Sequence, residues 1–231
     1  MTPIWWKRAL AEFLATFAVT FVAAGALCTD QYSGGQLGLL GSALAYSLAT
    51  AVMMSATAPI SGGHLNPAVT LASWLTGGIK LPMAALYLVA QLAGATIAAF
   101  VLLRTYSFEI WQPVDLGTPA LAAGVSFATG GFVEAVLTFF LVLTVLQVYL
   151  CEEKRDLFAG FIVGAVLLCG ILLGGPLTGA AMNPARAFGP ALVSGVWPNH
   201  SVYWVGPLTG AILGTFAYSA LRTTDSRTPA K

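Results

Sequence analysis

The stretch GGHLNPAVT, residues 62–70, is partly repeated by AAMNPARAF, residues 180–188, so Asn-Pro-Ala occurs twice, with the second asparagine 117 residues after the first. Each copy begins a short apolar run, about 66–76 and about 183–193. Asparagine is a favoured helix N-cap, and proline suits the first helical position because its missing N–H needs no partner there. Each copy therefore predicts a short helix that begins at its Asn-Pro-Ala.

The composition indicates that both short helices lie in a membrane. Of 231 residues, 58% are hydrophobic and only 8% are charged. An ordinary soluble domain has roughly a quarter charged residues, and it could not bury so much apolar surface at this length. The formal net charge of +1 argues against nucleic acid as a partner. The three cysteines, Cys28, Cys151 and Cys169, show neither a metal-ligand spacing nor a disulfide pattern.

Six other apolar segments are long enough to cross a bilayer, which takes about 20 residues. The predicted spans are about 9–27, 39–58, 82–103, 125–149, 157–175 and 201–221. The two short helices, at ~1.5 Å per residue, reach only about half of the hydrocarbon thickness. The first span carries Glu12 and lacks a convincing cleavage site, so we interpret it as a retained helix rather than a signal peptide.

The basic residues predict the orientation of these spans. Once six spans are drawn, only Arg104 falls on one side of the membrane. The residues on the other side are Lys7, Arg8, Lys80, Lys154, Arg155, Arg222, Arg227 and Lys231. Because cytoplasmic loops carry the excess of Lys and Arg, both termini should be cytoplasmic and the connector of about 104–124 extracellular. The expected location is the plasma membrane.

The repeat extends beyond Asn-Pro-Ala. Glu12 in the first span recurs as Glu134 in the fourth, and Tyr87 in the third recurs as Tyr203 in the sixth. The chain is thus predicted to be a single transmembrane channel domain, 1–231, made of repeats of about 1–105 and 125–222. Three spans per repeat is an odd number, so the second repeat is inverted relative to the first. In inverted repeats, sites lie near the midplane at interrupted helices.

The site predicted at the midplane is a narrow path for water. If the short helices enter from opposite faces, their N-termini meet there with unpaired backbone N–H groups and about half a positive charge each. The asparagine amides then donate hydrogen bonds to passing water, whereas cations are repelled and a proton cannot be relayed. The predicted pore residues are Asn66, Pro67, Ala68, Asn183, Pro184 and Ala185.

Arg186 breaks the pattern, because a charged side chain in the bilayer costs at least ~2.5–3.5 kcal/mol on insertion scales. Its counterpart in the first repeat is Val69. A residue that breaks such a local rule without a structural benefit is expected to have a functional role. We expect Arg186 to line the pore on the extracellular side of the centre.

These features resemble the aquaporin (major intrinsic protein) family. The resemblance rests on SGGHLNPAVT, NPARAFGPAL and AEFLATF, and it covers essentially the whole chain. It implies an all-α membrane protein with six transmembrane helices and two re-entrant half-helices, one pore per subunit, a homotetramer surrounded by lipid, and passive flow of water. It implies no cofactor, no metal and no enzyme activity.

The family pattern also implies a selectivity filter of Tyr46, Ile171, Ala180 and Arg186. Glycerol facilitators carry an Asp after the second motif where this chain has Ala187, which favours the water branch. Strict water channels carry a His where this chain has Ile171, which favours a wider, less polar filter. Ammonia, hydrogen peroxide or other small neutral solutes are therefore candidate permeants beside water. A glycerol-type facilitator is the alternative.

Three polar residues have two interpretations each. Glu12 and Glu134 are either proton-coupling carboxylates or, as their repeated position favours, acceptors for backbone N–H groups of the segments that lead into each Asn-Pro-Ala. His64 is either a pH-sensitive gate or a packing residue of its segment. A secondary transporter is the main competing class, since it also uses inverted repeats. An intramembrane enzyme and a purely structural junction protein are weaker alternatives.

Overall fold

The structure is a computed structural model that describes residues 4–149 and 158–221, all of whose regular elements are helical. The long helices are α1 (Trp5–Tyr32), α2 (Gly38–Ser61), α4 (Leu81–Thr105), α6 (Phe127–Thr144), α7 (Ala159–Thr178) and α9 (Val202–Leu221). The short elements are α3 (Pro67–Leu75), α5 (Phe108–Trp111), α8 (Pro184–Ser194), the 3-10 helix η1 (Gln112–Gly117) and the π-helix η2 (Val145–Tyr149). Each predicted span and half-helix therefore corresponds to one helix, except that the fourth span, about 125–149, covers both α6 and η2.

Several bounds differ from the predicted ones by a few residues, and two of these differences involve a proline. Spans ending at residues 58 and 175 were expected, yet α2 contains Pro59 and α7 contains Pro176. Both helices continue for two residues beyond the proline and end at a left-handed glycine, Gly62 (φ 95°) or Gly179 (φ 79°). The N–H of each glycine bonds to a carbonyl four residues earlier, at 3.1 and 2.9 Å, which closes the last turn. Proline at these places therefore does not end the helix.

Some of the sequence predictions concern residues outside the described part of the chain. Five of the basic residues used for orientation are among them, as is Leu157, the first residue of the predicted fifth span. The five are Lys154, Arg155, Arg222, Arg227 and Lys231. Orientation in the structure is therefore judged from Lys7, Arg8, Lys80 and Arg104.

The two repeats pack in the same way. α1 packs on α2 and α4, whereas α6 packs on α7 and α9, and α2 against α7 joins the two halves. Glycines permit the closest contacts: a Cβ on Gly94 of α4 would collide with the Phe13 carbonyl of α1, and one on Gly210 of α9 with the Ala135 carbonyl of α6. Each half-helix packs on the opposite repeat, α3 on α9 and α8 on α4.

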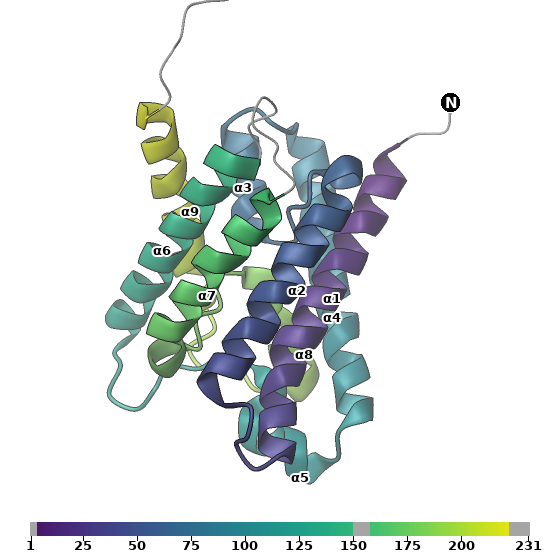
Figure 1. Cartoon of the computed structure of the whole chain (residues 1–231), viewed down its shortest axis with the longest axis vertical. Coiled ribbons are helices and arrows are strands. Elements are labelled where there is room, and N and C mark those ends of the chain that lie inside the picture. Colours follow the sequence, from purple (N-terminus) through teal and green to yellow (C-terminus); the bar gives the residue numbers. More distant parts are fainter. Residues whose placement is uncertain (1–3, 150–157, 222–231) are drawn as a thin grey trace, which may run out of the picture.

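The two ends of the bundle are distinct. The start of α1 and the end of α9 lie at one end, whereas α5 lies at the other (Figure 1). Of the two half-helices, α3 lies toward the end that holds the start of α1, and α8 lies toward the end that holds α5 (Figure 1). The half-helices thus approach the middle from opposite ends.

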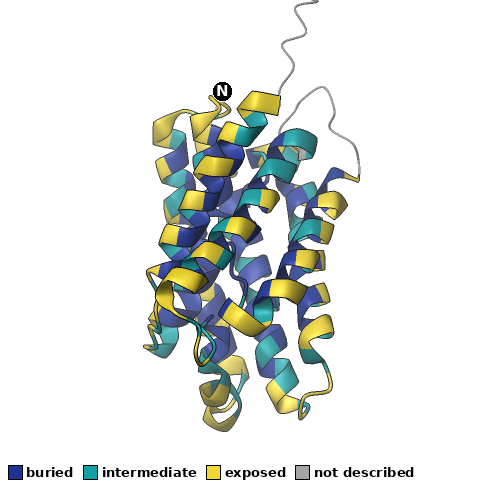
Figure 2. Cartoon of the chain, turned by 90° about the vertical axis from the view of Figure 1, so that its left-hand side faces the viewer, coloured by how far each residue is buried: buried dark blue, intermediate teal, exposed yellow. Residues whose placement is uncertain are grey.

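The outside of the bundle is apolar. Buried residues face inward and exposed ones outward (Figure 2), and the exposed side chains include Phe132 (70% exposed), Phe216 (69%) and Val89 (65%). Among the described residues, α1, α2, α4, α7 and the segment Phe127–Val148 are long and apolar enough to cross a membrane. α9 has the same length as α7, 20 residues, but is not among these segments. An apolar exterior on helices of this length suits lipid rather than water.

Candidate functional site

The two Asn-Pro-Ala motifs begin α3 and α8, and each asparagine caps its own helix. The Asn66 Oδ1 accepts a hydrogen bond from the Ala68 N–H at 2.8 Å. The Asn183 Oδ1 accepts from the N–H groups of Ala185 at 3.0 Å and Arg186 at 3.3 Å. In each helix the proline takes the first position, where its lack of an N–H leaves no donor without a partner.

The amide nitrogens of the same asparagines join the two half-helices. The Asn66 Nδ2 donates to the Met182 carbonyl at 2.8 Å, and the Asn183 Nδ2 donates to the Leu65 carbonyl at 3.0 Å. Both acceptor residues have left-handed backbones, with φ of 54° at Leu65 and 50° at Met182. The N-termini of α3 and α8 therefore meet through a reciprocal pair of bonds. Because an amide has two N–H donors, each asparagine keeps one for another partner.

Glu134 supports the segment that leads into α8. Its Oε1 accepts from the Thr178 hydroxyl at 2.7 Å and the Ala181 N–H at 2.9 Å, and its Oε2 accepts from the Met182 N–H at 2.8 Å. The carboxylate is fully buried. The Tyr203 hydroxyl adds a bond to the Thr178 carbonyl at 2.8 Å. These contacts match the supporting interpretation of the carboxylate.

Glu12 supports the segment that leads into α3 in the same manner. Its Oε1 accepts from the Ser61 hydroxyl at 2.7 Å and the His64 N–H at 2.9 Å, and its Oε2 accepts from the Leu65 N–H at 2.7 Å. A fourth donor, the Gln91 Nε2, reaches Oε2 at 2.8 Å. The position equivalent to Gln91 in the second repeat is Pro207, so the first carboxylate has the larger polar network.

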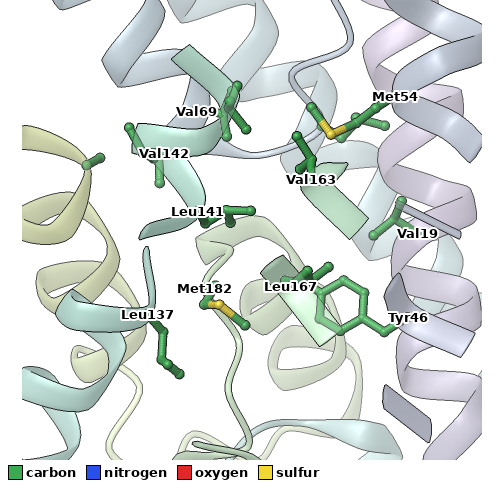
Figure 3. Close-up of a cluster of buried hydrophobic side chains, with 14 of the residues drawn as sticks. Val19, Tyr46, Met54, Val69, Leu137, Leu141, Val142, Val163, Leu167 and Met182 are labelled. Atoms are coloured by element: carbon green, nitrogen blue, oxygen red, sulfur yellow. The ribbon is translucent and has the colours of Figure 1, made fainter. Parts of the chain in front are cut away.

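A narrow cavity of ≈ 20 Å³ runs beside the two asparagines. Its lining comprises Val19, Tyr46, Thr50, Met54, His64, Leu65, Asn66, Val69, Leu141, Val145, Val163, Leu167 and Asn183. Side chains such as Val69, Val163 and Leu141, from three different helices, surround this space (Figure 3). No Asp, Glu, Lys or Arg is among the lining residues. A volume of this size holds about one water molecule at a time.

Of the four predicted filter residues, Tyr46 also lines this cavity, and Arg186 lies in the first turn of α8. Tyr46, Ile171 and Ala180 belong to one buried cluster. The Arg186 guanidinium carbon lies 5.9 Å from the centre of the Tyr46 ring, and the Tyr46 hydroxyl donates to the Ala181 carbonyl at 2.9 Å. Arg186 is only 3% exposed, and its Nη1 donates to the Gly117 carbonyl at 2.7 Å.

His64 is packed rather than free to move. It is 2% exposed, its Nδ1 lies 3.1 Å from the Thr70 hydroxyl, and its ring meets the Tyr87 ring edge-on with centroids 5.1 Å apart. The Thr70 hydroxyl also accepts from the Gln91 Nε2 at 2.9 Å. The His64 side chain therefore lines the cavity while Thr70 and Tyr87 hold its ring in place.

An aromatic cluster supports the far end of α8. His200 lies in the turn before α9, with the ring of Trp197 edge-on at 4.7 Å and the ring of Phe188 at 6.3 Å between centroids. The Trp204 Nε1 donates to the His200 Nε2 at 3.1 Å, so this nitrogen is an acceptor. Partial burial lowers the pKa of His200 below its ordinary value, which keeps the ring neutral at pH 7. Arg186 is then the charged group that α8 brings to this side of the pore.

Sequence reasoning missed the roles of four residues at the site. Gly117 supplies a backbone carbonyl, which leaves no side-chain signal in a sequence. Gln91 is a polar residue within an apolar span, and that position was the available signal. The hydroxyls of Tyr87 and Tyr203 bond to the Ser61 and Thr178 carbonyls at 2.6 and 2.8 Å. Their repeated position was noticed without this role.

An apolar helical bundle with two half-helices that meet beside a narrow uncharged cavity defines the class of helical membrane channels. Residues 1–218 match the family described as "Major intrinsic protein". The chain belongs to the major intrinsic protein family. This is a family of channels, so the prediction that the chain is not an enzyme is confirmed.

Several relatives are similar over most of their length. "Aquaporin TIP4-4" of Zea mays is 44% identical over 227 residues, which cover 93% of this chain and 86% of the relative. "Aquaporin TIP4-1" of Arabidopsis thaliana is 44% identical over 218 residues, covering 92% and 84%. "Lens fiber major intrinsic protein" of Gallus gallus is 41% identical over 216 residues, covering 92% and 80%. The resemblance drawn from the sequence is confirmed.

A solved structure has the same fold. The "X-ray structure of the aquaglyceroporin from Plasmodium falciparum" superposes with a TM-score of 0.83 at 23% identity, over 94% of this chain and 96% of that one. At this identity the likeness shows the fold alone. The predicted all-α membrane fold is confirmed, and the protein is a multi-pass integral membrane protein.

Proposed function

We propose that the protein is a passive water channel whose path crosses the membrane between the N-termini of α3 and α8. The observation that carries this proposal is the reciprocal pair of bonds between Asn66 and Met182 and between Asn183 and Leu65, beside a cavity of ≈ 20 Å³. The second N–H of each amide donates to a passing water oxygen. The relatives named aquaporins support the same function.

The same arrangement excludes ions and protons. Each half-helix N-terminus carries about half a positive charge, and the two meet beside the cavity that Asn66 and Asn183 line. A cation that leaves bulk water finds no acidic side chain in the cavity lining to replace its hydration. A water that accepts from both asparagines has its oxygen lone pairs occupied, so it cannot accept a proton from its neighbour. The channel therefore passes water while charge is refused.

Tyr46, Ile171, Ala180 and Arg186 form the selectivity filter in this proposal. The guanidinium donates hydrogen bonds to a solute that has left bulk water, and Ile171 and Ala180 supply apolar walls. A filter with one polar wall less than a strict water filter admits small neutral molecules such as ammonia and hydrogen peroxide. His64 has a packing role, because its Nδ1 is bonded to the Thr70 hydroxyl and its ring contacts the Tyr87 ring. A pH-dependent water flux that disappears in His64→Phe would overturn that role.

Osmotic shrinkage of proteoliposomes in a stopped-flow instrument tests the function. We expect water flux well above that of protein-free liposomes, with no increase in proton leak under an imposed pH gradient. The same vesicles under peroxide, ammonia and glycerol gradients test the solute range, and we expect the first two to enter and glycerol to stay near the lipid background. Glycerol entry comparable to that of peroxide favours the glycerol-type alternative. Accumulation of a solute against its gradient under an imposed ion gradient favours a secondary transporter.

We further propose a homotetramer in the plasma membrane with cytoplasmic termini. The orientation is supported by Lys7, Arg8 and Lys80, which lie at the starts of α1 and α4, whereas Arg104 lies at the opposite end of α4. The tetramer is supported by the family resemblance. Cross-linking in native membranes that stops at a dimer contradicts the tetramer. Protease access to the termini from outside contradicts the orientation, and fractionation with internal membranes contradicts the location.

A further inference from the structure

The connector between the repeats contains three consecutive left-handed residues. Asp115 has φ 47° and ψ 41°, Leu116 has φ 55° and ψ 27°, and Gly117 has φ 77°. A left-handed conformation is strained for residues with a Cβ, and it persists only where the surrounding structure holds it. Two such residues in succession therefore call for a specific anchor.

Leu116 is that anchor. Its side chain is fully buried in a cluster with Ala24 and Cys28 of α1 and Ala99 and Leu102 of α4. The next residue approaches α1 so closely that a Cβ on Gly117 would lie 2.7 Å from the Ala24 Cα. The connector backbone is thus pressed against α1 at this point, and glycine is required there.

The anchored backbone reaches directly into the filter. The Gly117 carbonyl accepts from the Arg186 Nη1 at 2.7 Å, while the Arg186 Nε has no hydrogen-bond partner among residues 4–149 and 158–221. The Thr118 hydroxyl lies 3.4 Å from the Ser194 hydroxyl at the end of α8, a second link between connector and half-helix. The position of the guanidinium consequently depends on where the connector holds this carbonyl.

We propose that Leu116 is a positioning residue for solute selectivity: its burial between α1 and α4 fixes the left-handed turn that keeps the Gly117 carbonyl on Arg186. This inference rests on the proposed role of Arg186 in the filter. Leu116 itself touches no permeant. When its side chain is shortened, the strained turn relaxes, the carbonyl withdraws and the guanidinium is free to leave the pore wall. Solutes larger than water then gain access.

The test is a double-mutant cycle of Leu116→Ala and Arg186→Ala, read as the ratio of glycerol to water permeability in proteoliposomes. For Leu116→Ala we expect this ratio to rise about tenfold, equivalent to about 1.4 kcal/mol, the size of one hydrogen bond to a charged group. In the Arg186→Ala background, Leu116→Ala should change nothing further, because no guanidinium remains to be positioned. Leu116→Met, which keeps the volume, should retain the parental ratio.

Leu102→Ala is the matched control, since it shortens a leucine of the same buried cluster on α4 rather than on the connector. The inference is overturned if Leu102→Ala raises the ratio of glycerol to water permeability as much as Leu116→Ala does, or if Leu116→Ala leaves this ratio unchanged. It is also overturned if Leu116→Ala raises the ratio equally in the wild type and in the Arg186→Ala background. If Leu116→Ala does not fold, Leu116→Val is read by the same criteria. An unchanged ratio in Arg186→Ala alone instead refutes the filter role on which the inference rests.

Discussion

Replacing Glu134 with glutamine is expected to abolish most of the water permeability, because the segment before α8 loses part of its support. The carboxylate accepts from the Thr178 hydroxyl, the Ala181 N–H and the Met182 N–H. Glutamine offers one acceptor oxygen, and its amide NH₂ must face a backbone N–H. The lost charge-assisted bond and the donors left without partners cost together about 3–6 kcal/mol, against a typical total stability of about 5–15 kcal/mol.

The loss reaches the pore because the Met182 carbonyl holds the Asn66 amide at 2.8 Å. When the Met182 N–H loses its acceptor, the left-handed turn that presents this carbonyl is no longer fixed. The measurement is osmotic shrinkage per reconstituted protein, together with the fraction of monodisperse protein in detergent. Tyr203→Phe is the control, since it removes a neutral bond of about 1 kcal/mol to the same segment and should keep most of the flux.

The equivalent change in the first repeat, Glu12→Gln, should be milder. The Gln91 Oε1 has no hydrogen-bond partner within the described residues, while its Nε2 donates to Glu12. A half-turn of the Gln91 amide places this oxygen against the new NH₂ group. The turn breaks the bond from the Gln91 Nε2 to the Thr70 hydroxyl, and the Leu65 N–H loses its acceptor, but the segment keeps the rest of its support. Equal or greater damage from Glu12→Gln, or wild-type flux in Glu134→Gln, would contradict this account of the two carboxylates.

The elements of the fold could be predicted from the sequence because lipid makes the signals strong. Long apolar runs gave the spans, and Asn-Pro at the head of a short run gave α3 and α8 to within one residue at each end. The ends of α2 and α7 were less accessible, since the usual rule that proline ends a helix fails at Pro59 and Pro176. The π-turn at Val145–Tyr149 leaves no mark in the hydrophobic pattern.

The site could be predicted only where side chains perform the role. Asn66 and Asn183 were recognisable, but their bonds to the Leu65 and Met182 carbonyls were not, because any residue carries a carbonyl. The Gly117 carbonyl on Arg186 was invisible for the same reason. These carbonyls are oriented by left-handed turns at residues that carry a Cβ. Such turns are held by tertiary packing and are not favoured by the local sequence. Backbone groups that are positioned by distant contacts are thus the part of the site that a sequence conceals.

Arg186→Ala is expected to keep water flux while it removes much of the selectivity. The guanidinium is 3% exposed and held at one wall of the filter by the Gly117 carbonyl. At an effective dielectric constant of ~20, a monovalent cation about 5 Å away is repelled by about 3 kcal/mol, which corresponds to roughly a hundredfold in rate. Removal of the side chain should therefore raise cation leak by about this factor and widen the passage for glycerol and urea.

Arg186→Lys separates the charge from the hydrogen-bond geometry. Lysine keeps the positive charge but lacks the planar set of donors that reaches both the Gly117 carbonyl and a solute. Cation leak should consequently stay near the wild-type value in Arg186→Lys, whereas glycerol and urea flux should rise as in Arg186→Ala. The measurements are potassium flux from loaded vesicles and stopped-flow solute entry. An equal cation leak in both variants would mean that the charge at position 186 does not exclude cations. The filter would then exclude them by its width, and any electrostatic barrier would come from the dipoles of α3 and α8 alone.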